Sequence, residues 1–442
     1  MTSNRLFGVS VITVLVAAGA IVAACGDDGG KGDPGAPGPA GVAGPPGAPG
    51  PAGPAGGSVG VDGGSILSGA CTTPCHTFNG VVDQWRFSGH SHPQENEIGT
   101  GACGNCHGLD GIQQRVANKW IVTGDSGAPV DVPKGHINYR ASPSNAVSEI
   151  SYGGATAIGK IHCTTCHDFN ATNDPHVTGK YTSHQAPLRV AGGANDTVIL
   201  EKTAGVSPAQ PAGQSLAYGA GNVCVFCHKS RKDVSLYITA NNTMSNARWG
   251  PHEGPQSDVY SGKGGYHFGS QTYSSSAHAT LANACVSCHM APVAANGNVP
   301  DHTMKPAVAF CKTCHTEYGG ATFDIQGGQT LVSNALKELQ GLLDAKGLLT
   351  RSESAPYAEL SAEERDDRQY HLDHVRPGSG PAGAHQQVDA ATAGAIYNYL
   401  IVARSKDLGV HNPTYAKQLL WDSIKQLLPA AQNPQSLPAR PN

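Results

Sequence analysis

Six pairs of closely spaced cysteines, each followed at once by a histidine, constrain this chain more than any other feature. Five pairs have two residues between the cysteines and the first has three. The pairs are Cys71/Cys75, Cys103/Cys106, Cys163/Cys166, Cys224/Cys227, Cys285/Cys288 and Cys311/Cys314, and the histidines are His76, His107, His167, His228, His289 and His315. Of the 13 cysteines, only Cys25 lies outside the pairs. Neither a disulfide framework nor a zinc ribbon needs a histidine after every second cysteine.

The repeated Cys-x-x-Cys-His pattern is that of covalent haem attachment. Two thiols add to the two vinyl groups of one porphyrin, and the short gap lets both sulfurs reach the same porphyrin edge. The histidine that follows binds the iron as its proximal ligand. The sequence therefore predicts six covalently attached haem c groups. Aromatic residues make up only 6% of the chain, so porphyrins would also supply buried apolar volume that the side chains lack.

The first motif, Cys71-Thr-Thr-Pro-Cys75-His76, is the least regular of the six. Pro74 adds one residue, so the backbone must bulge for both sulfurs to reach one porphyrin. Two free or disulfide-paired cysteines with a chance histidine are the alternative. We expect a haem here because every other cysteine after the leader belongs to such a motif.

Each haem iron also needs a second axial ligand or an open position. The chain has 20 histidines, whereas Met244, Met290 and Met304 are its only methionines after Met1. Ligation by two histidines is therefore expected, and it gives lower reduction potentials than His/Met ligation. The predicted distal ligands are His90, His176, His252, His278, His302 and His411, with His92 and His184 as rivals of the first two and His136 and His267 as the strongest candidates left out.

The N-terminal residues 1–24 are typical of a secretory signal, with Arg5 before a long apolar run. Val22-Ala23-Ala24-Cys25 resembles a bacterial lipobox, in which Cys25 takes a lipid and becomes the mature N-terminus. A single membrane-spanning anchor is the alternative, because the apolar run is about as long as the shortest spanning helices. Gly26 directly follows Cys25. Glycine at this second position resembles the bacterial sorting signals that direct a lipoprotein to the outer membrane. We expect an outer-membrane lipoprotein exposed at the cell surface, with a periplasm-facing protein as the alternative.

Glycine occupies every third position through most of residues 25–58, as in Gly35-Ala36-Pro37 and Gly38-Pro39-Ala40. This period is collagen-like, since the axis of a triple helix admits only glycine at every third place. A homotrimer and a single extended stalk both fit the pattern. The single stalk is favoured because nothing else in the sequence requires a trimer, and it would span on the order of 100 Å. Either form would lift the rest of the protein off its membrane.

Beyond the last motif, the spacing of apolar residues becomes helical. Residues 332–346 place leucines on one helical face, namely Leu336, Leu339, Leu342 and Leu343. Ser361 and Glu364 form a capping box, which predicts a charged helix through His371 and His374.

Two further helices are expected after these, each with its own N-cap. Asp389 caps the first, and Asn412 caps the second with Pro413 in its first turn. The expected buried faces are Tyr397, Leu400 and Ile401 in the first helix, and Tyr415, Leu419, Ile424 and Leu427 in the second.

The expected fold is therefore a multihaem cytochrome c made mainly of loops and short α-helices, with little β-structure and a C-terminal α-helical bundle. Its predicted parts are a signal peptide (1–24), a lipidated collagen-like stalk (25–58), a hexahaem domain (59–320) and a helical region that packs on the haems (321–442).

Residues from about 245 to 428 resemble a multihaem superfamily that contains ammonia-forming nitrite reductases, hydroxylamine oxidoreductases and outer-surface cytochromes of metal-reducing bacteria. The matching stretches are Gly250-Pro251-His252, Ser276-Ala277-His278, Cys288-His289-Met290-Ala291-Pro292, Asp301-His302-Thr303 and Gly409-Val410-His411-Asn412-Pro413. The resemblance implies that C-terminal helices pack on the haems and that His252, His278, His302 and His411 are iron ligands. Nitrite reductases of this group commonly anchor their catalytic haem with a lysine in place of the proximal histidine, and this chain has no Cys-x-x-Cys-Lys.

The favoured function is a surface electron carrier, not an enzyme. Its expected partners are other multihaem cytochromes or a porin–cytochrome conduit, extracellular acceptors such as ferric oxide or quinones, and the membrane through the lipid. A terminal reductase of nitrite, hydroxylamine or a sulfur oxyanion, with one open iron, is the alternative, and a structural filament subunit is a third. The net charge of -4 is too small to favour nucleic acid as a partner.

Overall fold

A computed structural model describes a set of segments of the chain. The segments are residues 81–91, 104–107, 119–120, 130–131, 139–141, 147–149, 161–168, 188–190, 197–201, 213–230, 232–293, 299–350, 374–376 and 385–442. The chain divides into two units, Met1–Ser58 and Val59–Asn442, and every described residue belongs to the second. The predicted signal peptide, the lipidation site at Cys25, the collagen-like stalk and the motif from Cys71 to His76 lie outside the described residues.

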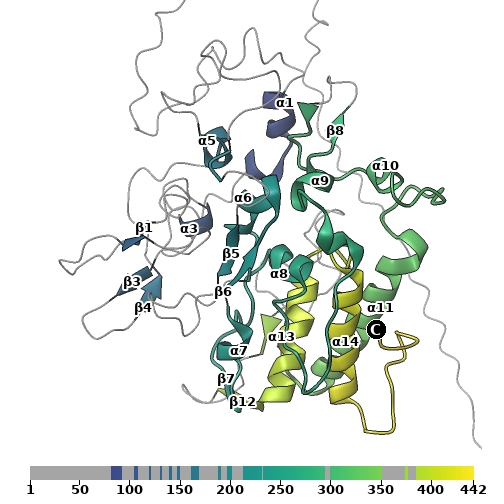
Figure 1. The fold of residues 1–442 in the computed structure, drawn as a ribbon. Coiled ribbons are helices and arrows are strands. Elements are labelled where there is room, and N and C mark those ends of the chain that lie inside the picture. The colour runs from purple at the N-terminus through teal and green to yellow at the C-terminus, as the bar shows by residue number, and fades with distance from the viewer. Residues whose placement is uncertain are drawn as a thin grey trace, which may run out of the picture. The chain divides into compact units, whose positions relative to one another are not determined.

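Short helices and two-stranded hairpins form the first part of the described chain (Figure 1). The helices are α1 (Val81–Arg86), η2 (Gly89–Ser91), α3 (Gly104–His107), α5 (Cys163–Cys166), η4 (Gly219–Gly221), α6 (Asn222–Val225) and α7 (Val234–Tyr237), where η marks a 3-10 helix. The strands are β1 (Lys119–Trp120), β2 (Val130–Asp131), β3 (Tyr139–Ala141), β4 (Val147–Glu149), β5 (Val198–Glu201) and β6 (Gly213–Leu216).

The second part carries the longer helices. Its helices are α8 (Gln256–Ser261), η5 (Ala277–Thr280), α9 (Cys285–His289), α10 (Val308–Cys311), η7 (Ile325–Gly327), α11 (Gly328–Ala345), α13 (Ala390–Arg404) and α14 (Pro413–Leu427). Its strands are β7 (Asn241–Met244), β8 (Pro292–Val293), β9 (Val299–Pro300), β10 (Leu349–Thr350), β11 (His374–Val375) and β12 (Gln386–Asp389).

All the strand pairs in the described segments are antiparallel and two strands wide. Five pairs are formed by consecutive strands of the described segments: β1–β2, β3–β4, β5–β6, β8–β9 and β10–β11. The β7–β12 pair joins distant segments, since Met244 lies opposite Gln386 and Asn241 lies opposite Asp389. Strand β12 runs directly into α13, so this pair fixes where α13 begins.

The three long helices α11, α13 and α14 pack on one another (Figure 1). Residues of α11 at helical spacing are fully buried, among them Val332, Leu336, Leu339 and Leu343. Helix α13 is buried along almost its whole length, which is expected of a helix that is apolar on every side. The largest core also contains Trp249, Val259 and Phe268 from before the helices. The helices and residues 238–268 therefore share one core.

The caps of the last two helices were predicted correctly. Asp389 accepts a hydrogen bond from the backbone N–H of Thr392 at the start of α13, at 2.7 Å. Asn412 accepts one from Tyr415 N–H at the start of α14, whose first residue is Pro413. Together with the short helices and the small amount of strand, they confirm the predicted fold class.

The expected helix through His374 was wrong at its end. His374 lies in strand β11 and pairs with Thr350 of β10. The following residue Arg376 precedes Pro377, and the residue before a proline is disfavoured in helical conformation. The extended backbone lets Val375, which is fully buried, join the core beneath α11. The rest of that expected helix lies outside the described residues.

A second, smaller core surrounds the β5–β6 hairpin and α6. It consists of Val190, Val198, Leu200, Leu216, Tyr218, Val225, Phe226, Tyr260 and Ala284. Cys227 and Cys285, which belong to two different attachment motifs, pack against it. This core therefore holds those two motifs beside each other.

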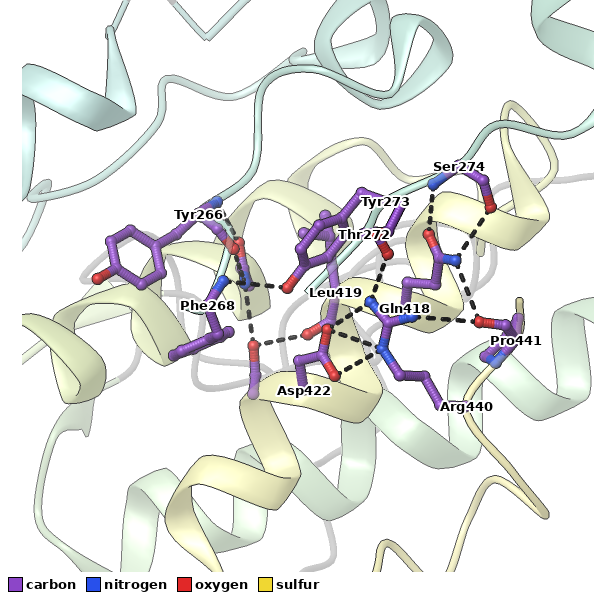
Figure 2. Close-up of polar contacts among 12 residues, drawn as sticks. Tyr266, Phe268, Thr272, Tyr273, Ser274, Gln418, Leu419, Asp422, Arg440 and Pro441 are labelled. Carbon is purple, nitrogen blue, oxygen red and sulfur yellow. Dashed lines mark hydrogen bonds and ion pairs between the residues drawn. The ribbon is translucent and has the colours of Figure 1, made fainter. Parts of the chain in front are cut away.

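A polar network ties the C-terminal residues and the segment 266–274 to α14 (Figure 2). Arg440 forms a bidentate ion pair with Asp422, at 2.8 Å from Nε to Oδ1 and 2.9 Å from Nη2 to Oδ2. It also donates a hydrogen bond to Thr272 O. Gln418 accepts from Ser274 N–H at 2.9 Å and donates to Pro441 O at 3.1 Å. Paired hydrogen bonds between arginine and carboxylate are among the strongest in proteins. The contacts of Arg440 therefore hold the C-terminal residues and the segment 266–274 against α14.

Gly394, in the middle of α13, lies directly against the ring of Tyr266. A Cβ atom at this position would lie 2.2 Å from Tyr266 Cδ1, and Asn398 Oδ1 fixes the Tyr266 backbone at 2.7 Å. We expect Gly394→Ala to lower the free energy of unfolding by about 1–3 kcal/mol, because overpacking outweighs the better helix propensity of alanine.

Gly341→Ala in α11 is the matched control, because nothing lies within 4 Å of the added carbon. It should raise stability by about 0.5–1 kcal/mol in guanidinium unfolding. Equal effects of the two substitutions would contradict the close approach at Gly394.

Candidate haem sites

Each attachment motif that the structure describes begins in or forms a short helix, and the helices α6 and α10 end before the second cysteine of their motifs. Helix α5 begins at Cys163 and ends at Cys166, and His167 N–H bonds back to Cys163 O at 2.9 Å. The same backbone bond joins His228 to Cys224 O and His315 to Cys311 O. Residues three and four apart lie on the same face of a helix. The turn therefore presents both sulfurs and the imidazole of a motif on one side.

Five of the predicted distal histidines each lie beside a different proximal histidine. The pairs and their ring-centroid separations are His107–His252 (6.4 Å), His167–His302 (6.2 Å), His228–His90 (5.9 Å), His289–His411 (6.1 Å) and His315–His278 (6.1 Å). In every case the partner comes from outside the motif's own turn. His76 and His176 lie outside the described residues.

This separation fits two imidazoles on opposite sides of one iron. Since an imidazole nitrogen lies about 2 Å from a bound first-row metal ion, two such rings place their centroids roughly 6 Å apart. Within the described segments, no three or more His, Cys, Asp or Glu side chains gather as ligands of a single metal ion. Each pair thus offers two axial ligands, and the four nitrogens of a porphyrin would complete the coordination of the iron. The residues therefore fit haem.

The Nδ1 atom of most paired histidines faces a hydrogen-bond acceptor, which leaves Nε2 for the iron. Five such contacts are to neutral oxygens: His228 to Gln256 Oε1 (3.1 Å), His252 to Glu253 O (2.7 Å), His278 to Val410 O (2.6 Å), His289 to Met304 O (2.9 Å) and His302 to Pro300 O (2.8 Å). Metal-binding histidines usually donate their other N–H in this way, which fixes the ring and raises its basicity.

The Nδ1 atom of His90 lies 2.9 Å from Met304 Sδ, and that of His411 faces a charged group. Asp407 Oδ2 lies 3.2 Å from His411 Nδ1, and both side chains are largely buried. Burial alone would lower the pKa of His411, but Asp407 raises it. Iron at Nε2 would replace the proton there, while Nδ1 keeps its own proton facing the carboxylate.

Other buried members of the pairs are held neutral. Burial, and then the neighbouring His228 and His289, lower the pKa of His90 to about 4. Burial also lowers the pKa of His228 and of His289. The neutral imidazole is the form that binds a metal ion, so these rings are ready to do so without losing a proton.

Two described histidines outside the pairs have other uses. The ring of His267 stacks on Tyr273 at 3.9 Å, and its Nε2 is 2.9 Å from Tyr415 Oη. His162 caps α5 by accepting a hydrogen bond from Thr164 N–H. The rivals His92 and His184, and also His136, lie outside the described residues.

Attachment motifs from distant parts of the chain contact one another. Cys227 Sγ lies 3.6 Å from Cys106 O. The thiols of Cys224 and Cys285 are hydrogen-bonded, which together with burial raises the pKa of Cys224. Burial, and then Cys311 nearby, raises the pKa of Cys288 to about 11. The motifs at 103–107, 224–228, 285–289 and 311–315 therefore form a continuous series.

The thiols of the motifs differ in their surroundings. The nine cysteines whose side chains are described form no disulfide with one another. Burial raises the pKa of Cys166 to about 11. The contact with Cys224 lowers the pKa of Cys285.

Cys314 is more exposed than the other described cysteines of the attachment motifs. Its side chain is exposed, whereas those of the other eight described motif cysteines are partly buried. The physical reason is local, because Lys312, Thr313 and Thr316 around it are exposed as well, so this turn lies at the surface. Its Sγ accepts a weak hydrogen bond from Thr313 Oγ1 at 3.9 Å. Haem attachment at Cys314 stays a prediction, and a haem held there would have one edge toward solvent.

The residues that contact the Nδ1 atoms were missed by the sequence analysis. Asp407 precedes His411 by four residues, and this spacing is a local signal that could have identified it. Gln256 and Met304 reach their histidines only through the tertiary fold, and no sequence pattern marks them.

No protein-family model and no curated protein matches the chain. Among solved structures, an outer cell wall cytochrome named OcwA matches with 18% identity and a TM-score of 0.40, over 79% of this chain. The match spans 50% of that protein's length. No helix in the described segments is long and apolar enough to cross a lipid bilayer. The function proposed below is carried by the paired histidines and not by this match.

Proposed function

We propose that this protein is a hexahaem c-type cytochrome that transfers electrons at the outer cell surface. The observation that supports it best is the set of five histidine pairs at the separation of two ligands on one iron. A haem iron held in this way cycles between ferric and ferrous states and so carries one electron. The chain's own residues attach the groups, fix both axial ligands and place neighbouring motifs in contact.

The sixth haem is proposed at Cys71, Cys75 and His76, with His176 as its distal ligand. The lipid at Cys25 and the collagen-like segment would hold the protein at the outer membrane and extend it outward. Other multihaem cytochromes or a porin–cytochrome conduit would supply electrons. Extracellular ferric oxide or quinones would accept them.

Two axial histidines at each iron favour electron transfer over catalysis on a small substrate. A terminal reductase needs an open iron with polar groups above it. In the five described pairs, the ring centroids lie 5.9–6.4 Å apart, a separation that would let both imidazoles hold one iron. Electron transfer requires only orientation, spacing and tuned potential from the protein.

Kinetics of the purified holoprotein test the proposal. The protein is reduced, its haem is quantified, and it is mixed in separate experiments with a ferric chelate, a quinone and nitrite, each with a protein-free control. We expect oxidation of all six haems by the chelate and the quinone, and no steady-state consumption of nitrite. Catalytic turnover of nitrite or hydroxylamine, with no transfer to the ferric chelate, would contradict electron transfer as the function.

A further inference from the structure

Asp407 occupies a turn between α13 and α14 that is built around its carboxylate. Asp407 Oδ2 accepts a hydrogen bond from His411 N–H at 2.7 Å, and the Ser405 hydroxyl donates to Oδ1. Gln329 Nε2 donates to the Asp407 carbonyl at 3.2 Å. Only 6% of the side chain is exposed. Several donors around a buried carboxylate favour its ionised form.

The backbone of this turn is strained. Lys406 and Leu408, neither of them glycine, have φ values of 56° and 48°. Such left-handed conformations cost roughly 1–3 kcal/mol each, and they persist only where the surroundings enforce them. The carboxylate belongs to a residue four positions before His411. The conformation of this turn places it next to the His411 ring.

The acceptor at His411 differs in charge from the Nδ1 acceptors given above for five other paired histidines. The Nδ1 contacts of His228, His252, His278, His289 and His302 are to amide or backbone carbonyl oxygens, which are neutral. The Nδ1 contact of His411 is to a carboxylate, at 3.2 Å. A carboxylate draws the Nδ1 proton more strongly, so the ring donates more electron density through Nε2.

We propose that Asp407 is a positioning residue that acts on the haem held by Cys285, Cys288, His289 and His411, and that it lowers the reduction potential of that haem. The inference rests on the proposed function. A more basic axial ligand stabilises ferric iron, and a buried negative charge opposes the arrival of an electron. Both effects lower the potential of this one site.

The test is an EPR-monitored redox titration of the full-length holoprotein, with haem quantified on each sample. The signal of this site is identified as the low-spin signal that His411→Ala removes. Asp407→Asn keeps an oxygen acceptor but makes it neutral, like the Gln256 amide oxygen at His228. We expect the ferrous fraction at a fixed potential to rise by about tenfold, equivalent to 59 mV for one electron.

Two further variants separate the charge at His411 from general effects. Asp407→Glu restores a carboxylate and should bring the potential back toward that of the unaltered protein. Asp422→Asn is the matched control, since Asp422 is a buried carboxylate that pairs with Arg440 and faces no paired histidine. It should leave this signal's potential unchanged.

The outcomes distinguish the inference from the proposed function. If Asp407→Asn retains six low-spin haems and moves no potential, or if Asp422→Asn moves the same potential equally, the inference is wrong and the proposed function stands. High-spin iron at this pair in the unaltered protein would instead overturn the proposed function.

Discussion

His252→Ala is expected to convert one of the six haems from low-spin to high-spin. His252 is exposed, and its ring lies 6.4 Å from that of His107, so the substitution removes an axial ligand with little effect on the core. The ferric iron left with one histidine has an open position, which favours the high-spin state. Low-temperature EPR should show one high-spin haem per chain, and added cyanide or imidazole should restore a low-spin signal.

His267→Ala is the matched control for this substitution. His267 is also exposed, but its Nε2 contacts Tyr415 Oη and its ring stacks on Tyr273. All six haems should remain low-spin in this variant. The assignment of His252 would be wrong if both variants kept every haem low-spin, or if His267→Ala opened an iron.

Asn412→Ala is expected to destabilise the protein and to disturb two haem sites together. The side chain is fully buried. It accepts hydrogen bonds from Tyr415 and Ser276 N–H, and it donates to Tyr260 O and Ser275 Oγ.

An unpaired buried polar group costs about 1–3 kcal/mol. Because Asn412→Ala leaves more than one such group, we expect it to lower the free energy of unfolding by about 2–4 kcal/mol.

The effect on the haems follows from where Asn412 lies. It follows His411 directly and bonds to residues just before His278. Loosening this contact should therefore raise the high-spin fraction at the pairs His289–His411 and His315–His278, with the other haems unchanged. Guanidinium unfolding and EPR on the same samples provide the two measurements.

Asn433→Ala is the control for Asn412→Ala, because Asn433 is an exposed asparagine in the C-terminal segment. It should change stability by less than about 0.5 kcal/mol and leave the EPR spectrum unaltered. A loss of stability in Asn412→Ala with no change at either haem pair would show that the cap supports α14 alone.

Local signals in the sequence predicted most of the fold class. The Cys-x-x-Cys-His motifs at 163–167 and 285–289 form short helices, since their spacing matches the helical period. Asp389 and Asn412 cap α13 and α14 because their side chains accept hydrogen bonds from N–H groups three residues ahead. The helix expected from the capping box does not extend through His374. This residue lies in strand β11, close before Pro377.

The distal histidines could be predicted from the sequence, but the proximal histidine that each one faces could not. His278 lies just before Cys285, yet its ring faces His315 of the last motif. His90 precedes the second motif and faces His228 of the fourth. These pairings depend on how distant segments cross in space, and no local spacing encodes that. For the same reason, the exposure of Cys314 became visible only in the structure.

The orientation of the paired rings gives each site a distinct magnetic signature. The rings of His90–His228 and His278–His315 are nearly perpendicular, at 88° and 86°. Those of His167–His302 and His289–His411 are closer to parallel, at 28° and 37°. In low-spin ferric haem, perpendicular imidazoles give strongly anisotropic EPR signals, whereas near-parallel imidazoles give rhombic ones. The spectrum can therefore separate sites that absorb light almost identically.

Low-temperature EPR of the oxidised, purified protein, with haem quantified on the same sample, tests the paired-histidine account most directly. The account predicts six haems per chain, all low-spin, with two strongly anisotropic signals and at least two rhombic ones. A stoichiometric high-spin ferric signal that shifts on addition of nitrite or hydroxylamine would contradict it and would favour a terminal reductase.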